Sequence, residues 1–279
     1  MVNYDVILYM KLSIITINYN NCAGLKKTID SVIAQTWRDF EWIVIDGGST
    51  DGSKELIEKY QEHFAYWCSE PDKGVYNAMN KGVAKANGEY LNFMNSGDIF
   101  HDAFVLSNVF KEDIVADILI GQVVTVGENE IINQQVNLDL WRVLTGFCHQ
   151  GTFVKLKYLK MYPFDESLKI VSDWKLWIQT IVFDNCKVQW LDIIVADYDM
   201  TGISSKENKL DNIEREIVLN QLFPPLILNE LNNYQSLRYE PFVRKIKYMK
   251  ENSTIVYYIL SKIIDAACIL SLKLNKLKR

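Results

Sequence analysis

Short apolar runs, separated by amphipathic stretches, organise the first part of the chain. The run at 12–17 is rich in β-branched side chains and is followed by polar residues, as expected of a buried strand. Residues 25–35 then place apolar side chains at helical spacing. Repetition of this alternation predicts a doubly wound, mostly parallel α/β sheet. Strands are expected at 12–17, 41–45, 64–69 and 89–94, and helices at 25–35, 53–60 and 75–86.

The alternation is less regular in the following hundred or so residues. Residues 116–126 are strand-like, and residues 131–136 are expected to pair back on them as a hairpin. A helix is expected to end near residue 183, a last strand lies at 189–198, and the pattern is helical after it. Three segments are therefore predicted: an N-terminal extension at 1–9, an α/β domain at 10–205 and a helical C-terminal appendage at 206–279.

Polar side chains accompany four predicted strands at the point where each strand ends. Thr16 and Tyr19 belong to the first strand, Asp46 ends the second, and Asp72 and Asp98 follow the next two. The carboxyl ends of parallel strands form the edge where α/β sheets bind ligands. Carboxylates gathered there repel one another unless a cation or ligand donors lie between them. This pattern predicts a nucleotide site, with Mg²⁺ or Mn²⁺ bridging carboxylate and diphosphate.

Each of these acidic residues also has a simpler interpretation when it is taken alone. Asp46 suits a turn or a helix cap, and Asp72 suits the start of a turn. Asp98 precedes the apolar pair Ile99 and Phe100, so it suits the cap of a helix. Their joint occurrence at one sheet edge is what favours a ligand site over these alternatives.

The charge distribution adds a second feature to the chain. Hydrophobic residues make up 49% of the 279 residues, enough for a substantial core, and the formal net charge of −5 does not indicate a nucleic-acid partner. Residues 241–279, however, hold nine Lys and Arg against Glu251 and Asp265, a net charge of +7, so the remainder carries −12. The five cysteines have no CxxC spacing, which predicts reduced thiols in a cytoplasmic protein.

The basic C-terminal segment also has a broad apolar face. Residues 255–277 are rich in Ile, Leu and Tyr, while Lys262, Asp265, Lys273 and Lys276 recur near helical spacing. A helix of this kind lies in a membrane interface rather than spanning it. Residues 255–279 are therefore predicted to hold the protein peripherally at the inner face of the cell membrane. The alternative is a helix that packs on the α/β domain or on a second subunit, in a homo-oligomer.

Several motifs follow one another in a recognisable order and spacing: SIITINYN, IDGGSTDGS, EPDKGVYNAMNKGVAKANGEYLNFMNSGD, HQGTF, FDESLKIVSDW and TGIS. With these motifs the chain resembles family 2 glycosyltransferases with the GT-A fold, the large bacterial group that builds surface polysaccharides. The resemblance covers residues 11–205. It implies an inverting transfer of a sugar from a nucleotide-sugar, with UDP as the expected nucleotide, to a hydroxyl of a saccharide or lipid-linked saccharide.

The resemblance implies roles at the donor end of such a site. Thr16 and Tyr19 match positions that line the base pocket. Asp46 matches the acid that hydrogen-bonds the nucleobase, usually uracil. Asp72 matches a loop over the nucleotide, and Lys81 lies in a segment where a basic residue approaches the diphosphate.

The metal motif departs from the pattern of the family it resembles. Residues 95–98 occupy the place of the family's DxD-type motif, with Asp98 as the implied ligand of Mn²⁺ or Mg²⁺. Asn95 and Gly97 stand where acids are common. The carbonyl of Asn95 still accepts a hydrogen bond, for example from a ribose hydroxyl, but adds no charge. Metal affinity would then depend on Asp98, the diphosphate and waters.

At the other end, the resemblance implies that Asp173 is the general base that deprotonates the acceptor hydroxyl. The simpler alternative is that Asp173, or Ser172 beside it, caps a helix. His149 and Gln150 match a pair near the acceptor or donor sugar. Trp174 suits stacking on a sugar face and core packing equally well.

Two further classes fit the sequence less well. A sugar-phosphate nucleotidyltransferase would require a basic, Gly-rich loop after the first strand, but residues 18–24 contain no Lys or Arg. A dinucleotide-dependent oxidoreductase would show GxGxxG after a strand, which this chain lacks. The remaining alternative is a non-catalytic, saccharide-binding relative of a glycosyltransferase, and the altered motif at 95–98 is its support.

Overall fold

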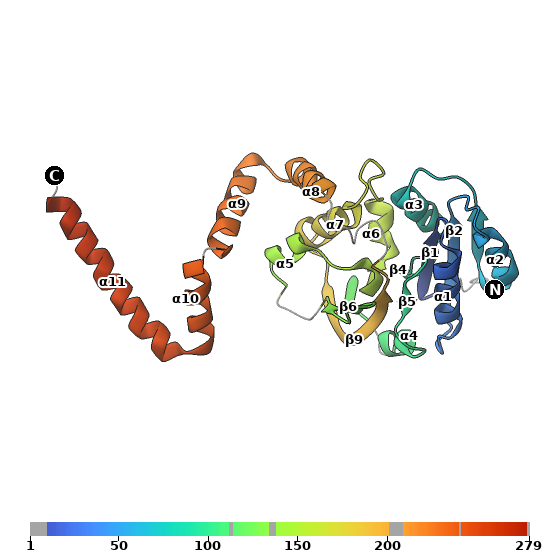
Figure 1. Ribbon diagram of the computed structural model, residues 1–279, viewed down its shortest axis with the longest axis horizontal. Helices are drawn as coiled ribbons and strands as arrows, with labels where there is room; N and C mark the ends of the chain where they lie inside the picture. Colours follow the sequence, from blue (N-terminus) through green and yellow to red (C-terminus); the bar gives the residue numbers. More distant parts are fainter. Residues whose placement is uncertain (1–9, 112–113, 134–137, 201–208, 240, 278–279) are drawn as a thin grey trace, which may run out of the picture. The chain divides into compact units, whose positions relative to one another are not determined.

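The computed structural model describes residues 10–111, 114–133, 138–200, 209–239 and 241–277 (Figure 1). The expected N-terminal extension at 1–9 lies outside these residues. The chain divides into two compact units, one ending at Arg215 and the other beginning at Glu216. The first unit thus continues beyond residue 205, because helix α8 begins in it.

One nine-stranded mixed sheet forms the centre of the first unit, in the order β3-β2-β1-β4-β8-β6-β9-β5, with β7 paired to β6. The ladders of β1 with β2 and β4, of β2 with β3, and of β6 with β9 are parallel, and they contain most of the paired residues. The expected α/β, mostly parallel fold class is confirmed. The strands are β1 (Leu12–Asn18), β2 (Phe40–Asp46), β3 (Tyr66–Ser69), β4 (Tyr90–Phe93), β5 (Ile99–Phe100), β6 (Ile118–Thr125), β7 (Ile131–Ile132), β8 (Thr152–Lys155) and β9 (Val188–Tyr198).

Short helices connect these strands in the first unit, and longer ones follow the sheet. The α-helices are α1 (Cys22–Ile33), α2 (Ser53–Tyr60), α3 (Val75–Lys85), α4 (Val105–Val109), α5 (Leu140–Thr145), α6 (Leu156–Met161), α7 (Ser172–Trp177), α8 (Lys209–Leu222), α9 (Pro225–Tyr239), α10 (Pro241–Asn252) and α11 (Thr254–Leu277). Two 3-10 turns, η1 (Gln61–His63) and η2 (His149–Gly151), and the π-helical segment η3 (Ile178–Phe183) complete the description.

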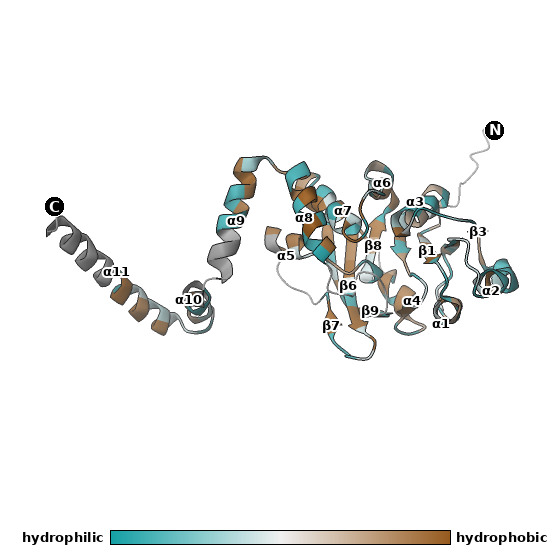
Figure 2. Ribbon diagram, turned by 45° about the horizontal axis from the view of Figure 1, so that its top comes forward, coloured by the Kyte–Doolittle hydropathy of each residue, from teal (hydrophilic) through white to brown (hydrophobic). Residues whose placement is uncertain are grey.

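Strand β1 is buried along all seven residues, because helices cover both faces of the sheet. Leu12 and Ile14 belong to one core cluster with Leu25 and Ile29 of α1. On the opposite face, Ile15 lies against α3, so close to Gly82 that a side chain there would collide with it. Alternate residues of a strand point to opposite faces, so this arrangement is the double winding that the sequence predicted. Figure 2 shows the hydrophobic residues along β6 and β9 and the hydrophilic residues on α2.

The residues after the fourth strand decide two sequence expectations. Ile99 and Phe100 form β5, which pairs antiparallel with β9, so the simpler alternative that Asp98 caps a helix is wrong. The reason is that the apolar pair forms the edge strand of the sheet by pairing with a distant strand, which the local sequence does not reveal. The hairpin partner of β6 is confirmed at 131–132, and the rest of its expected range, 134–136, lies outside the described residues.

The second unit is helical, as expected, with α10 in contact with both α9 and α11. The first half of α11 leaves large apolar side chains exposed, among them Ile255, Tyr258 and Ile263. Within the described residues, none of the helices combines the length and apolarity that crossing a bilayer requires.

Candidate functional site

A cavity of about 1080 Å³ lies at the carboxyl ends of the parallel strands β1, β2 and β4. The sequence predicted a ligand site at this edge, and most of the predicted residues reach it. Side chains from six separate segments converge on the cavity, so the fold rather than any local motif assembles it. The predicted residues that line it are Tyr19, Asp72, Asn95, Asp98, His149, Gln150 and Asp173.

Asp46 lies beneath this cavity rather than in its wall. Its side chain is fully buried, and its carboxylate accepts hydrogen bonds from Asn18 Nδ2 (2.7 Å), Ser69 Oγ (2.6 Å), and both the amide (2.9 Å) and hydroxyl of Ser49. Burial alone would raise the pKa of Asp46, but these hydrogen bonds outweigh it and hold the pKa below its ordinary value. Asp46 therefore shapes the loop that follows β2, and the next two residues, Gly47 and Gly48, line the cavity.

Thr16 is also withdrawn from the cavity. It continues the alternation of Leu12 and Ile14, so its side chain points into the same buried face of the sheet. Its hydroxyl donates to the carbonyl of Met94 (2.8 Å) and accepts from Trp42 Nε1 (3.0 Å). Both hydrogen-bonding capacities are used inside the fold, which gives Thr16 a structural position.

Asp72 and Tyr19 form the wall at the β2 end of the cavity. A Cβ placed on Gly47 would come within 2.6 Å of Asp72 Oδ2 and 3.1 Å of Tyr19 Cδ2. The missing side chain at 47 thus leaves room for both groups. Tyr19 is 67% exposed, and Asp72 Oδ1 accepts from the amide of Gly74 at 2.8 Å. Lys81, in contrast, pairs with Glu70 at 2.8 Å and does not line the cavity.

A group of oxygen atoms lies at the centre of the cavity, around Asp98. Asp98 is 4% exposed, and its carboxylate accepts from Gln150 Nε2 (2.9 Å) and from the amide of Asp199 (3.0 Å). Burial raises its pKa to about 6, although these hydrogen bonds oppose the rise. Gly97, with φ +107°, lies against Asp199, whose Oδ2 is 2.9 Å from the position of an added Cβ. The side-chain oxygen of Asn95 is buried without a hydrogen-bond partner.

These residues suit a hard divalent cation. Asp98, Asp199 and the orphaned Oδ1 of Asn95 are oxygen donors, and Mg²⁺ and Mn²⁺ prefer oxygen. Among the described residues, no three His, Cys, Asp or Glu side chains form a complete site by themselves. Such a cation would therefore also need oxygens from a bound phosphate or from water.

Asp173 lies at the far end of the cavity, in the first turn of α7. That helix begins at Ser172 with Val171 at its N-cap position, so Asp173 does not cap it. One oxygen of Asp173 lies 3.2 Å from His149 Nδ1, and the other lies 3.3 Å from the hydroxyl of Tyr76. Burial, followed by the charge of Asp173, raises the pKa of Tyr76 well above its ordinary value, so Tyr76 remains a neutral phenol.

His149 connects the two ends of the site. Its Nδ1 faces Asp173, and its Nε2 lies 3.1 Å from Asn95 Nδ2. A proton on Nδ1 satisfies both contacts, because Nε2 can then accept from the amide of Asn95. Gln150, the next residue, instead donates to Asp98. The adjacent pair thus holds Asp173, through His149, and Asp98, through Gln150, in one hydrogen-bonded arrangement.

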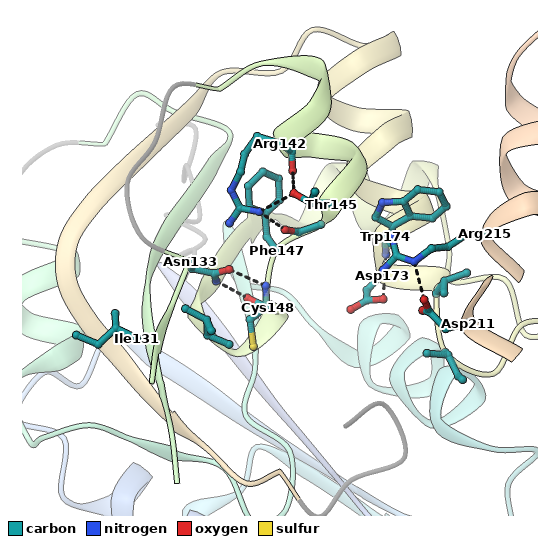
Figure 3. A pocket seen from close by; sticks show the side chains of 14 residues that line it. Ile131, Asn133, Arg142, Thr145, Phe147, Cys148, Asp173, Trp174, Asp211 and Arg215 are labelled. Carbon is teal, nitrogen blue, oxygen red and sulfur yellow. Dashed lines mark hydrogen bonds and ion pairs between the residues drawn. The ribbon is translucent and has the colours of Figure 1, made fainter. Parts of the chain in front are cut away.

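A second, smaller cavity of about 560 Å³ adjoins the first, and Asp173, Cys148 and Ile170 line both. Trp174 belongs to this second cavity. Its ring is 4% exposed, and its Nε1 donates to the carbonyl of Leu144 at 2.9 Å. Figure 3 shows this cavity, with Arg142 and Phe147 on one side and Trp174 and Arg215 on the other.

Comparison with known proteins identifies the family. The model of glycosyl transferase family 2 matches residues 13–164, more than half of the chain. The chain belongs to glycosyl transferase family 2. An uncharacterised glycosyltransferase of Mycobacterium tuberculosis (strain H37Rv) is 30% identical over 204 residues, which cover 70% of this chain and 77% of that relative. The PGL/p-HBAD biosynthesis glycosyltransferase of Mycobacterium bovis (strain BCG) is 28% identical, with 68% and 77% covered.

Solved structures confirm the GT-A fold of this glycosyltransferase. S. aureus TarS 1-349 in complex with UDP-GlcNAc has a TM-score of 0.58 and 19% identity, and the match covers 72% of this chain but only 61% of TarS. The mannosyltransferase PcManGT from Pyrobaculum calidifontis, in complex with GDP-Man and Mn²⁺, has a TM-score of 0.57 and 14% identity, with 94% and 81% covered. At these identities the likeness concerns the fold alone.

Sequence reasoning missed Asp199, Tyr76 and the second cavity. Asp199 directly follows β9, so the rule that strand ends carry functional side chains could have found it. No comparable pattern in the sequence marks Tyr76, which lies within helix α3. Its contact with Asp173 joins positions 97 residues apart and depends on how α3 and α7 pack.

Proposed function

We propose that this glycosyltransferase moves a sugar from a nucleotide-sugar, with UDP as the preferred nucleotide, to a hydroxyl of a saccharide or lipid-linked saccharide, with inversion at the anomeric carbon. The observation that supports this most is the continuous cavity that runs from Tyr19 and Asp72, past Asp98, to Asp173. It offers a flat aromatic surface, a metal-side acid and a carboxylate base in that order.

The nucleoside would lie at the Tyr19 end. The exposed ring of Tyr19 can stack on a base, and Asp72 presents a carboxylate at the cavity surface beside Gly47. Asp46 supports this end from below, by fixing the loop at Ser49 through its hydrogen bonds. Lys81 could reach the diphosphate only by leaving Glu70.

The diphosphate would lie beside Asp98. Asp98, Asp199 and Asn95 would hold Mn²⁺ or Mg²⁺ there, with Asp199 as a second carboxylate in place of the acids that are missing at positions 95 and 97. A divalent cation at this place supplies neutralisation of the charge that develops on the departing nucleoside diphosphate. In the metal-bound enzyme Asp98 must be ionised, which a nearby cation favours.

The chemical step would be one direct displacement. The acceptor oxygen forms a bond to the anomeric carbon while the bond from that carbon to the diphosphate oxygen breaks. Asp173 takes the proton of the attacking hydroxyl, and His149 holds its carboxylate in place. The hydroxyl of Tyr76 lies 3.3 Å from the other carboxylate oxygen, while it donates to the carbonyl of Ile170. A single displacement inverts the configuration, and its transition state has oxocarbenium-ion character.

A thermal-shift titration with UDP, GDP and dTDP, each with and without Mn²⁺, tests the donor site. UDP with Mn²⁺ should raise the melting temperature most. Asp98→Ala and Asp199→Asn should each reduce the Mn²⁺-dependent part of the shift, whereas Asp173→Asn should keep the shift and lose transfer and UDP-sugar hydrolysis. The exposed-surface variant Asp30→Asn serves as the matched control. An equal response to GDP would overturn the base assignment, and no response to any nucleotide would overturn the function.

The membrane contact predicted for residues 255–279 belongs to the same proposal. The exposed apolar residues of α11 would enter the interface, with Lys262 beside them near the headgroups. This arrangement would place the enzyme at the cytoplasmic face of the membrane, where a lipid-linked acceptor would lie.

A further inference from the structure

The second cavity offers the acceptor a place on the other side of the base. Asp173 lines both cavities, so a hydroxyl that enters from the smaller one can meet its carboxylate while the donor occupies the larger one. A volume of about 560 Å³ is within the usual range of small-molecule sites. Trp174 and Phe147 also line it, but both residues are buried, and each ring packs against an arginine side chain.

The cations in the wall of this cavity differ in how they are paired. Arg215 lies over the ring of Trp174 at 4.6 Å, and its Nε pairs with Asp211 Oδ2 at 2.9 Å. Arg142 comes from α5 and lies 4.5 Å from the ring centroid of Phe147. Its Nη1 donates to Thr145 Oγ1 and to the carbonyl of Gly146, both of which are uncharged.

Arg142 is thus a half-buried cation that has no anionic partner in the part of the chain that the structure describes. Among the described residues, no carboxylate lies within ion-pairing distance of its guanidinium. A partly desolvated charge is costly unless an opposite charge compensates it. Burial also lowers the pKa of Arg142, as expected of a cation that lacks such compensation. The other charged groups of the cavity are already paired, Arg215 with Asp211 and Asp173 with His149.

We infer that the smaller cavity is the acceptor subsite and that Arg142 binds a negatively charged group, a carboxylate or a phosphate, on the acceptor saccharide. This inference rests on the proposed function and names the acceptor's chemical class. A planar guanidinium can bind either group through two parallel hydrogen bonds, which fixes orientation as well as charge. The anionic group would orient the sugar so that one hydroxyl faces Asp173.

Binding of three simple probes tests this subsite. Methyl β-D-glucuronide carries the carboxylate, glucose 1-phosphate carries the phosphate, and methyl β-D-glucoside is the neutral control. Ligand-observed NMR on the full chain, with and without UDP and Mn²⁺, measures the dissociation constant of each probe. At least one anionic probe should bind at least about tenfold more tightly than the glucoside. The tighter of the two anionic probes distinguishes an acidic sugar from a sugar phosphate.

Substitutions assign the preference to Arg142. Arg142→Gln and Arg142→Ala should remove it, Arg142→Lys should keep part of it, and the exposed Arg38→Ala should leave it unchanged. The UDP-dependent thermal shift, which needs only the larger cavity, reports folding in every variant. Equal binding of all three probes, or a preference that survives Arg142→Gln, would overturn the inference while UDP binding persists. If the wild-type chain did not bind UDP at all, the result would instead count against the proposed function.

Discussion

At the carboxyl end of β2, one residue separates a buried carboxylate from the cavity surface. The side chains of a strand alternate between its faces, so Asp46 shares the buried face of Trp42 and Val44, while Gly47 reaches the cavity. Sequence reasoning located this strand end correctly and could not tell which side of it the ligand would meet. Asp72, which lies over Gly47, is instead the carboxylate at the cavity surface, and under the proposed function it is the one that would face the nucleotide.

This placement predicts that Asp46→Asn impairs stability in a pH-dependent way. The folded-state pKa of Asp46 lies below its ordinary value of 3.8, so the folded protein favours the ionised form. Its stabilising contribution is complete above about pH 4 and is lost as the pH falls through the lower, folded-state pKa. Urea unfolding should therefore show a loss of roughly 2 kcal/mol at pH 7 that shrinks towards pH 3.

The exposed Asp30→Asn is the control for this comparison, since a solvent-screened surface pair with Lys26 contributes little to stability. If Asp46→Asn left stability unchanged but abolished the UDP-dependent thermal shift, Asp46 would contact the base directly, and the supporting role would be wrong.

At the scale of elements, local patterns predicted the parallel strands well and the assembly of the site poorly. Buried strands with β-branched runs, such as β1 and β2, can be recognised in the sequence, and so can the polar residues that follow them. Strand β5, with two residues, has no such signal, and it pairs with β9 across nearly a hundred positions. The hydrogen bond from the amide of Asp199 to Asp98 depends on this same long-range pairing. A local pattern can mark Asp199 as the end of a strand but cannot place it beside Asp98.

Helix α8 contributes Glu214, whose contacts with a distant segment are likewise not evident from the local sequence. Its buried carboxylate accepts hydrogen bonds from the amides of Lys169 (2.7 Å), Ile170 (2.9 Å) and Val171 (3.3 Å), the residues that lead into α7 and Asp173. Glu214→Ala leaves these donors without their partner, which should cost about 2–3 kcal/mol of unfolding free energy. Transfer should fall because Asp173 is less well positioned, whereas the UDP-dependent shift should persist.

The neighbouring Glu216→Ala is the matched control, since its side chain is exposed. The split between kcat and KM separates positioning from general destabilisation: a positioning role lowers kcat at temperatures where both variants are fully folded. A Glu214→Ala enzyme with unchanged kcat under those conditions would limit Glu214 to a structural role.

At the scale of the whole molecule, charge is divided between an acidic body and a basic C-terminal segment. Residues 241–279 carry a net charge of +7 while the chain as a whole carries −5. Near an anionic membrane surface, each Lys or Arg contributes about 1 kcal/mol of attraction, which salt screens. The full chain should therefore sediment with phosphatidylglycerol-containing vesicles, more weakly in high salt, and much less with phosphatidylcholine alone.

Charge reversal within the full chain tests whether this segment is responsible. Lys262→Glu, Lys273→Glu and Lys276→Glu together lower the segment's net charge from +7 to +1 and should abolish sedimentation with anionic vesicles. The matched control reverses Lys26, Lys54 and Lys59, on α1 and α2, which changes the total charge equally. The two triple variants differ only in where the charges are reversed. An equal loss of sedimentation in both would therefore mean that the net charge of the chain governs vesicle binding. Retained sedimentation in the first would mean that the charge of this segment is not what holds the chain to the vesicles.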